Sequence, residues 1–136
     1  MSTKADFYVG RDTEAEWMGS IAWDGTPVAI PKVIREATSE EEFREQVARF
    51  LKNRSDAATA TQGWPWTWDS SYGTNYTYAF AEGKVWTCHY GSSWWDAMRP
   101  EPEHTSLKRK GAILPDMSNH RKRTAGPKGQ GILIVK

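Results

Sequence analysis

The first part of the chain alternates between apolar and polar positions in a way that predicts two strands. Residues 6–10 are rich in β-forming side chains and end at a glycine. Residues 16–23 alternate more roughly and are followed by a turn signal at residues 24–27. We expect the two strands to pair as a hairpin. The second strand is expected to carry one buried aromatic face, made of Trp17, Gly19, Ile21 and Trp23.

The next part of the chain, up to about residue 54, has the spacing of apolar residues that is typical of helices. Pro31 predicts a short first helix whose inward-facing residues are Val33, Ile34 and Ala37. Ser39 and Glu42 form a capping-box pattern, which predicts the start of a longer helix over about 40–54. The apolar residues of this second helix recur at the spacing of a single face: Phe43, Val47, Phe50 and Leu51.

Aromatic residues dominate the middle of the chain. Pro65 has no N–H for a sheet ladder, so we expect residues 63–68 at a sheet edge or in a bent aromatic loop. Residues 76–90 indicate a hairpin, for which we expect a three-residue loop at 81–83 instead of a two-residue Glu82-Gly83 turn. Such a loop would place these side chains on one face: Tyr76, Tyr78, Phe80, Trp86, Cys88 and Tyr90.

The last third of the chain is poor in apolar residues until its end. Residues 103–130 are basic and interrupted by proline and glycine, and only a few side chains are expected to hold them to the body: Ile113, Leu114 and Met117. The apolar run 131–135 predicts a strand buried on both faces. Together the patterns predict one domain over residues 1–136. We expect an α+β fold, a mainly antiparallel sheet with the helix at about 40–54 packed on one face.

Charge is unevenly distributed along the chain. Residues 104–136 carry eight Lys and Arg against one acid, a net charge of +7, while the other residues sum to −6. No apolar run approaches the length of a membrane span, and the N-terminus lacks the apolar region of a signal peptide. We therefore expect a cytoplasmic protein, and the single cysteine agrees with a reducing compartment.

Six of the eight tryptophans lie between residues 64 and 95. Tryptophan is rarely buried completely, and a domain of this size would struggle to bury eight of them. We therefore expect part of this cluster to form an exposed binding surface flanked by the basic segment, since Trp and Arg are enriched at binding hot spots. The candidate binding residues are Trp64, Trp66, Trp68, Trp94, Trp95, Arg109, Arg121 and Arg123.

The sequence nominates no catalytic residue, metal site or cofactor. Cys88 and His89 are neighbours on a predicted strand and point to opposite faces, which does not suit a metal site. Cys88 is better explained as a small core residue than as a nucleophile. The glycine-rich residues 126–131 lack the Gly-Lys-Ser/Thr ending of a phosphate-binding loop and precede a strand. No spacing selects a pair of carboxylates for acid–base chemistry.

Residues 7–11, 14–25 and 63–66 resemble a group of small uncharacterised proteins carried by bacteriophages and prophages. Residues 114–118 and 131–134 are similar to the C-terminal part of that group. The resemblance implies a small accessory protein that acts inside an infected bacterium, where such proteins often bind a host factor, including components of defence systems. The group has no assigned activity, so no functional residue carries over from it.

The leading hypothesis is a non-enzymatic protein that binds a host macromolecule, with aromatic burial for affinity and basic charge for steering. A first alternative is a binder of small molecules or nucleotides, in which rings stack on a base and Arg or Lys holds a phosphate. A second alternative is nucleic-acid binding through the basic C-terminal segment, although the acidic remainder of the chain would repel phosphates.

Overall fold

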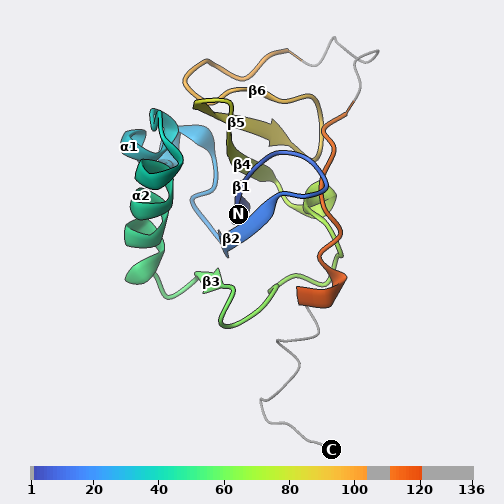
Figure 1. Cartoon of the computed structure of the whole chain (residues 1–136). Helices are drawn as coiled ribbons and strands as arrows, with labels where there is room; N and C mark the ends of the chain where they lie inside the picture. The colour runs from blue at the N-terminus through green and yellow to red at the C-terminus, as the bar shows by residue number, and fades with distance from the viewer. Residues whose placement is uncertain (1, 104–110, 121–136) are drawn as a thin grey trace, which may run out of the picture.

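The computed structural model describes residues 2–103 and 111–120. Six strands form one sheet in the order β3-β2-β1-β4-β5-β6, and each neighbouring pair is antiparallel except β1 with β4. With one principal helix against the sheet, this is the α+β fold that the sequence predicts (Figure 1). The strands are β1 (Ala5–Val9), β2 (Glu16–Ile21), β3 (Ala58–Thr59), β4 (Tyr76–Ala81), β5 (Lys84–His89) and β6 (Trp95–Asp96).

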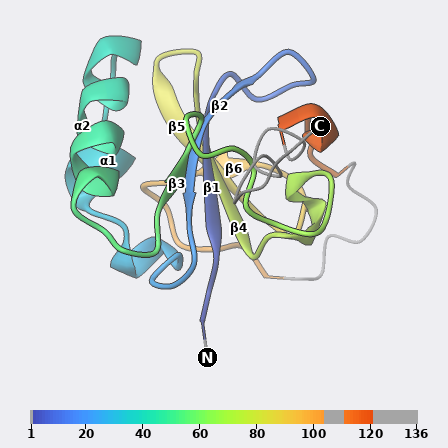
Figure 2. The same cartoon turned by 90° about the horizontal axis from the view of Figure 1, so that it is seen from below.

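Helices α1 (Lys32–Arg35) and α2 (Glu40–Lys52) lie against the same face of the sheet (Figure 2). Ser39 caps α2 as predicted, because its Oγ accepts a hydrogen bond from the backbone N–H of Glu42 at 3.1 Å. The predicted stripe of α2 packs on the sheet, with buried Phe43, Val47 and Leu51 and a half-buried Phe50. Ile34 in α1 and Ala37, which lies just beyond the end of this helix, are buried, but Val33 is exposed, so its predicted inward position is wrong.

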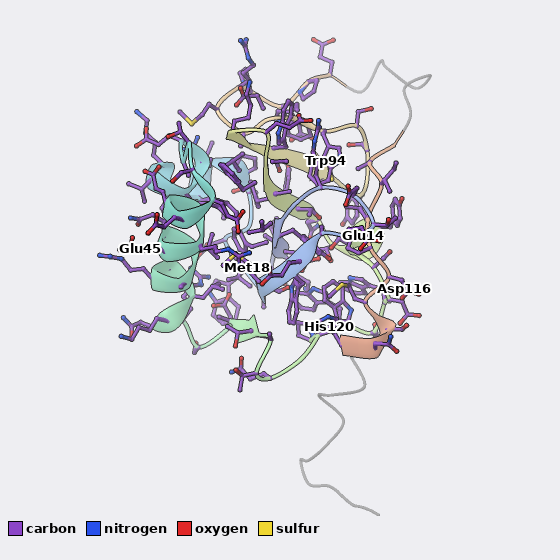
Figure 3. The ribbon with its side chains drawn as sticks, viewed as in Figure 1. Glu14, Met18, Glu45, Trp94, Asp116 and His120 are labelled. Carbon is purple, nitrogen blue, oxygen red and sulfur yellow. The ribbon has the colours of Figure 1, made fainter. Side chains whose placement is uncertain are left out.

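β1 and β2 form the predicted hairpin, and a β-bulge interrupts it. The pairing shifts by one residue between Phe7 and Tyr8, so that Met18 is an extra residue in β2. The extra residue reverses the alternation of side chains. Trp17 therefore packs on the sheet face away from the helices, whereas Ile21 packs under them. Met18 itself lies between β2 and α2 (Figure 3). The predicted face is therefore only partly right: Gly19 and Ile21 share the helix side, whereas Trp17 lies on the other side and Trp23 is exposed.

β4 and β5 form a hairpin whose loop is shorter than predicted. Ala81 pairs with Lys84, which leaves Glu82 and Gly83 as a two-residue turn with positive φ angles of 57° and 80°. The three-residue loop is therefore wrong, and so is the face predicted from it. Paired residues show that the side facing the helices carries Tyr76, Tyr78, Phe80, Val85, Thr87 and His89, while Trp86 and Cys88 lie on the other side.

The Trp loop, defined as residues 60–75, covers the second face of the sheet. β3 lies at one edge and the next strand, β4, lies beside β1, so the chain must cross β2 and β1 to reach it. The loop makes this crossing with only a short 3-10 turn, η2 (Ser71–Gly73), in agreement with the bent aromatic loop predicted for residues 63–68. Its rings build a second core from Tyr8, Trp17, Trp64, Trp66, Ala79 and Met117.

Residues 111–120 run along the same face as the Trp loop (Figure 2). Leu114 and Met117 are buried there as predicted, whereas Ile113 is exposed. Backbone bonds fix this segment to the Trp loop, including one from the N–H of Trp64 to the carbonyl of His120 at 3.3 Å. The predicted strand at 131–135 and most of the basic segment lie outside the described residues. In the described part of the chain, no helix has the length and apolar character to cross a membrane.

Candidate functional site

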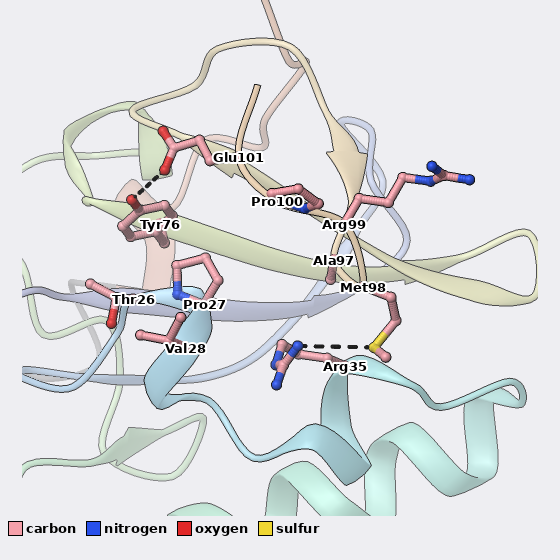
Figure 4. A pocket seen from close by; sticks show the side chains of 10 residues that line it. All are labelled: Thr26, Pro27, Val28, Arg35, Tyr76, Ala97, Met98, Arg99, Pro100 and Glu101. Atoms are coloured by element: carbon pink, nitrogen blue, oxygen red, sulfur yellow. Dashed lines mark hydrogen bonds between the residues drawn. The ribbon is translucent and has the colours of Figure 1, made fainter. Parts of the chain in front are cut away.

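Three segments enclose a groove beside helix α1: the loop after β2, the helix itself and the chain after β6 (Figure 4). The groove has a volume of about 450 Å³, within the range of roughly 300–1,000 Å³ found for ligand sites. One residue of β4, Tyr76, also reaches it. The groove is lined by Thr26, Pro27, Val28, Arg35, Tyr76, Ala97, Met98, Arg99, Pro100 and Glu101.

Apolar side chains in the groove remain open to solvent. Val28 is 91% exposed and Met98 is 43% exposed. The 3-10 turn η1 (Pro27–Ala29) holds Val28 in this position, since the N–H of Ile30 closes the turn on the carbonyl of Pro27 at 3.3 Å. Single exposed apolar residues are common, but several that share one hollow mark a surface suited to contact with another molecule.

Two arginines give the groove positive charge. Arg35 is half-buried, and its Nε donates a hydrogen bond to the carbonyl of Ile30 at 3.1 Å. Its Nη1 lies 4.0 Å from Sδ of Met98, so the guanidinium stands beside the exposed apolar side chain (Figure 4). Arg99 is exposed. Within residues 2–103 and 111–120, neither arginine forms an ion pair with a carboxylate.

The carboxylate of the groove is already engaged. Glu101 accepts a hydrogen bond from the hydroxyl of Tyr76 at 2.7 Å, and its other oxygen lies 3.2 Å from Nδ1 of His89. The imidazole of His89 stacks on the Tyr76 ring with 4.5 Å between the ring centroids. Burial, reinforced by the Glu101 carboxylate, raises the pKa of Tyr76, so the phenol stays a neutral donor. Glu101 is thus oriented by its neighbours and is poorly placed to neutralise the arginines.

Two other hollows lie along the outer side of α2. One is formed by Glu40, Glu41, Arg44 and Glu45, and the second by Glu45, Ala48, Arg49, Lys52 and the helix-capping Asn53. Each is a space between side chains of one helix, several of which already pair with each other across a turn. A single helix does not enclose a ligand, so the groove is the better candidate.

The predicted binding residues lie elsewhere in the structure. Trp64 and Trp66 are buried in the second core, and Trp95 is buried on the helix side. Trp95 belongs to the short edge strand β6. Trp68 and Trp94 are half-buried at the margin of the second core. None of these five rings lines the groove. Arg109, Arg121 and Arg123 lie outside the described residues.

The sheet accommodates the tryptophans because both of its faces are covered. The indole N–H groups of the Trp loop are satisfied inside: Trp64 Nε1 donates to the carbonyl of Trp68 at 2.5 Å, and Trp68 Nε1 donates to Thr74 Oγ1 at 2.8 Å. Trp66 Nε1 donates to the carboxylate of Asp6 at 2.8 Å. The indole rings therefore act as the packing layer of a crossover that has no long helix of its own.

Asp6 is a buried group that the sequence analysis did not single out. Its carboxylate is completely buried and accepts hydrogen bonds from Ser20 Oγ and Ser71 Oγ, both at 2.5 Å, as well as from Trp66. Burial raises the pKa of Asp6, and these hydrogen bonds offset part of the rise. The one available signal was an acidic residue inside a β-forming run, since its partners come from two distant parts of the sequence, β2 and the Trp loop.

The described residues offer little for covalent or metal chemistry. Cys88 is fully buried, and burial raises its pKa to about 12, so the thiol is not an activated nucleophile. Among the described residues, no group of three or more His, Cys, Asp and Glu is placed to hold a metal ion. The groove therefore supports recognition by burial and charge.

Comparison with known proteins gives no relative, because no protein-family model, no curated protein and no solved structure matches the chain.

Proposed function

We propose that this is a non-enzymatic binding protein that engages a partner protein through the groove. The observation that carries the proposal is the exposure of Val28 and Met98 at the mouth of one hollow, next to two arginines without a carboxylate partner in the described part of the chain. Apolar area supplies affinity when it is covered, and adjacent charges supply orientation and specificity.

The groove takes the place of the tryptophan cluster as the recognition surface. Trp64, Trp66 and Trp95 are committed to packing, so using them in binding would require the core to open. The groove needs no such rearrangement, because Val28, Met98 and Arg99 are already exposed. If the chain is phage-encoded, as its resemblance implies, the partner is a host protein, with defence components among the candidates.

A protein partner fits the groove better than a nucleotide. Stacking on a base requires a free aromatic face. Tyr76 is the one aromatic residue of the groove, its side chain is 8% exposed, and His89 already covers one face of its ring. Methionine and proline walls instead suit an aliphatic side chain, since the methionine side chain adapts its shape to what it contacts.

Site-specific photo-crosslinking tests this function. A photoreactive phenylalanine analogue would replace Val28 in the full chain, and a matched variant would carry it at Ala48, an exposed position on α2 outside the groove. In bacterial lysate we expect one protein to be crosslinked from position 28 and not from position 48. Capture of the same protein by the unlabelled chain should be lost with Met98→Ser. Equal crosslinking from both positions, or capture that is indifferent to Met98→Ser, would place the binding surface elsewhere.

A further inference from the structure

We propose that the groove takes a short acidic segment of the partner protein, in which one aliphatic side chain packs between Val28 and Met98 and a neighbouring carboxylate pairs with Arg35 and Arg99. The inference rests on the proposed function and specifies the chemistry of the ligand. Three features of the groove support it. The walls are apolar, the two arginines form no described ion pair, and Glu101, the only carboxylate among the lining residues, is already engaged.

The apolar part of the groove offers room for an aliphatic side chain of the ligand. Pro27 and Val28 form one wall, and Ala97, Met98 and Pro100 form the facing one (Figure 4). Ala97 is itself buried and fixes the base of that wall through a hydrogen bond from its N–H to the carbonyl of Val85 at 2.9 Å. A leucine-sized side chain placed there would cover the exposed parts of Val28 and Met98 together.

The positive charge lies directly beside this apolar part. The hydrogen bond from Arg35 Nε to Ile30 fixes the guanidinium, and its Nη1 points at the sulfur of Met98. Nη2 of Arg35 makes no hydrogen bond to any described residue, and the exposed Arg99 follows Met98 in the chain. A carboxylate one or two residues from an aliphatic anchor can therefore reach a guanidinium, which binds carboxylates through directed pairs of N–H groups.

The groove holds a net positive charge in spite of Glu101. The bonds from Tyr76 and the proximity of His89 occupy both oxygens of that carboxylate. The nearby Asp96 lies 3.4 Å from Lys84 and is paired there. Because residues 1–103 carry a net charge of −6, the attraction for an acid is local. This favours a ligand with one or two carboxylates beside an apolar anchor over a long polyacid.

Fluorescence anisotropy with labelled peptides and the full chain tests the inference. The probes are a short peptide with one leucine followed by two glutamates, the same peptide with glutamines in place of the glutamates, and the same peptide with glycine in place of the leucine. We expect the acidic leucine peptide to bind about tenfold more tightly than either of the others, as is typical when a charge-assisted contact or a buried side chain is removed. Its affinity should also fall with added salt.

Two arginine variants connect the charge effect to the groove. Arg99→Gln removes an exposed cation that makes no described ion pair, and Arg49→Gln removes another exposed cation, paired with Glu45, from the outer side of α2. We expect Arg99→Gln to weaken the acidic peptide severalfold and to leave the glutamine peptide unchanged, and Arg49→Gln to change neither. Val28→Ser should weaken both leucine-containing peptides.

The outcomes separate this inference from the proposed function. Equal binding of the acidic and glutamine peptides, or equal effects of Arg99→Gln and Arg49→Gln, would overturn the acidic ligand. In that case, crosslinking of a protein from position 28 would still support the proposed function. Displacement of the acidic peptide by inorganic tripolyphosphate, with no dependence on leucine, would also overturn it and identify a small-anion site.

Discussion

At the scale of single residues, Asp6 has an unusual environment, because its carboxylate is completely buried. A carboxylate is rarely buried completely, and this one has no basic partner in the described structure. Two serine hydroxyls and one indole N–H take the place of a cation. Ser20 also accepts a hydrogen bond from Trp17 Nε1 at 3.0 Å, and Tyr8 shares a bond of 2.9 Å with Ser71. The network joins β1, β2 and the Trp loop through one acidic group.

The raised pKa of Asp6 predicts a specific dependence of stability on pH. A group whose pKa is higher in the folded than in the unfolded protein stabilises the fold at low pH and loses that contribution as pH rises through the folded pKa. The wild type should therefore lose stability relative to Asp6→Asn as pH rises from about 4, the ordinary value for aspartate. Urea unfolding of both proteins at a series of pH values measures this difference.

Asp6→Ala provides the control for the network itself. It leaves the Ser20, Ser71 and Trp66 donors without an acceptor, so it should destabilise the protein by about 2–4 kcal/mol, more than Asp6→Asn at every pH. If the wild type instead gained stability over Asp6→Asn with rising pH, the hydrogen bonds would outweigh burial and the direction of the pKa shift would be opposite.

At the scale of elements, the features that depend on residues close together in the sequence are the ones that were predicted correctly. The helix at α2 was predicted with its cap and three of its buried residues, because capping and the helical period are set by neighbours in sequence. The hairpin at residues 76–90 was predicted as a hairpin, but the side chains of β5 were assigned to the wrong face. A loop that is shorter by one residue moves each side chain of the second strand to the opposite face of the sheet. The bulge at Met18 had the same effect on β2 and left no mark in the sequence.

The groove was not predictable from local patterns at all. Its lining residues come from four separate stretches, around residues 27, 35, 76 and 99, and none of them carries a motif. The turn signal at 24–27 marked one of these stretches only as a turn. The convergence of these stretches depends on the sheet order and on the paths of the two loops: β2 and β6 are separated by β1, β4 and β5, and the loop after β2 and the chain after β6 meet beside Tyr76 of β4. Sheet order was the part of the fold that the sequence left open.

The β4–β5 turn gives a direct test of its revised geometry. Glu82 has a φ of +57°, a conformation that asparagine tolerates better than glutamate, and positive φ at both turn residues is typical of a type I′ turn. Glu82 also forms an exposed ion pair with Arg11 at 3.0 Å. Glu82→Gln removes that charge alone, so Glu82→Asn should be more stable than Glu82→Gln by about 0.5–1 kcal/mol. Equal stability of the two variants in chemical denaturation would contradict the two-residue turn.

At the scale of the whole molecule, both faces of the sheet are covered, each by a different kind of structure. Two helices cover one face, and the other is covered by a crossover whose tryptophans replace a helix. The backbone of this crossover is largely irregular, so its order depends on ring packing and on the bonds to Asp6 and to residues 111–120. The tryptophans of the Trp loop are therefore better understood as part of the second core than as an exposed recognition surface.

Trp64 and Trp23 provide a matched pair that tests this view of the whole fold. Trp64 is 1% exposed and meets Trp17 edge to face at 5.4 Å between centroids, whereas Trp23 is 47% exposed beyond the end of β2. Trp64→Ala should cost about 3–5 kcal/mol, since it opens a cavity in the second core, and Trp23→Ala should cost about 1 kcal/mol or less. Denaturant unfolding followed by circular dichroism measures both. The opposite result would be a Trp64→Ala protein that keeps its stability but no longer captures the partner. In that case the Trp64 ring would belong to the binding surface, and the groove would not be the main site of recognition.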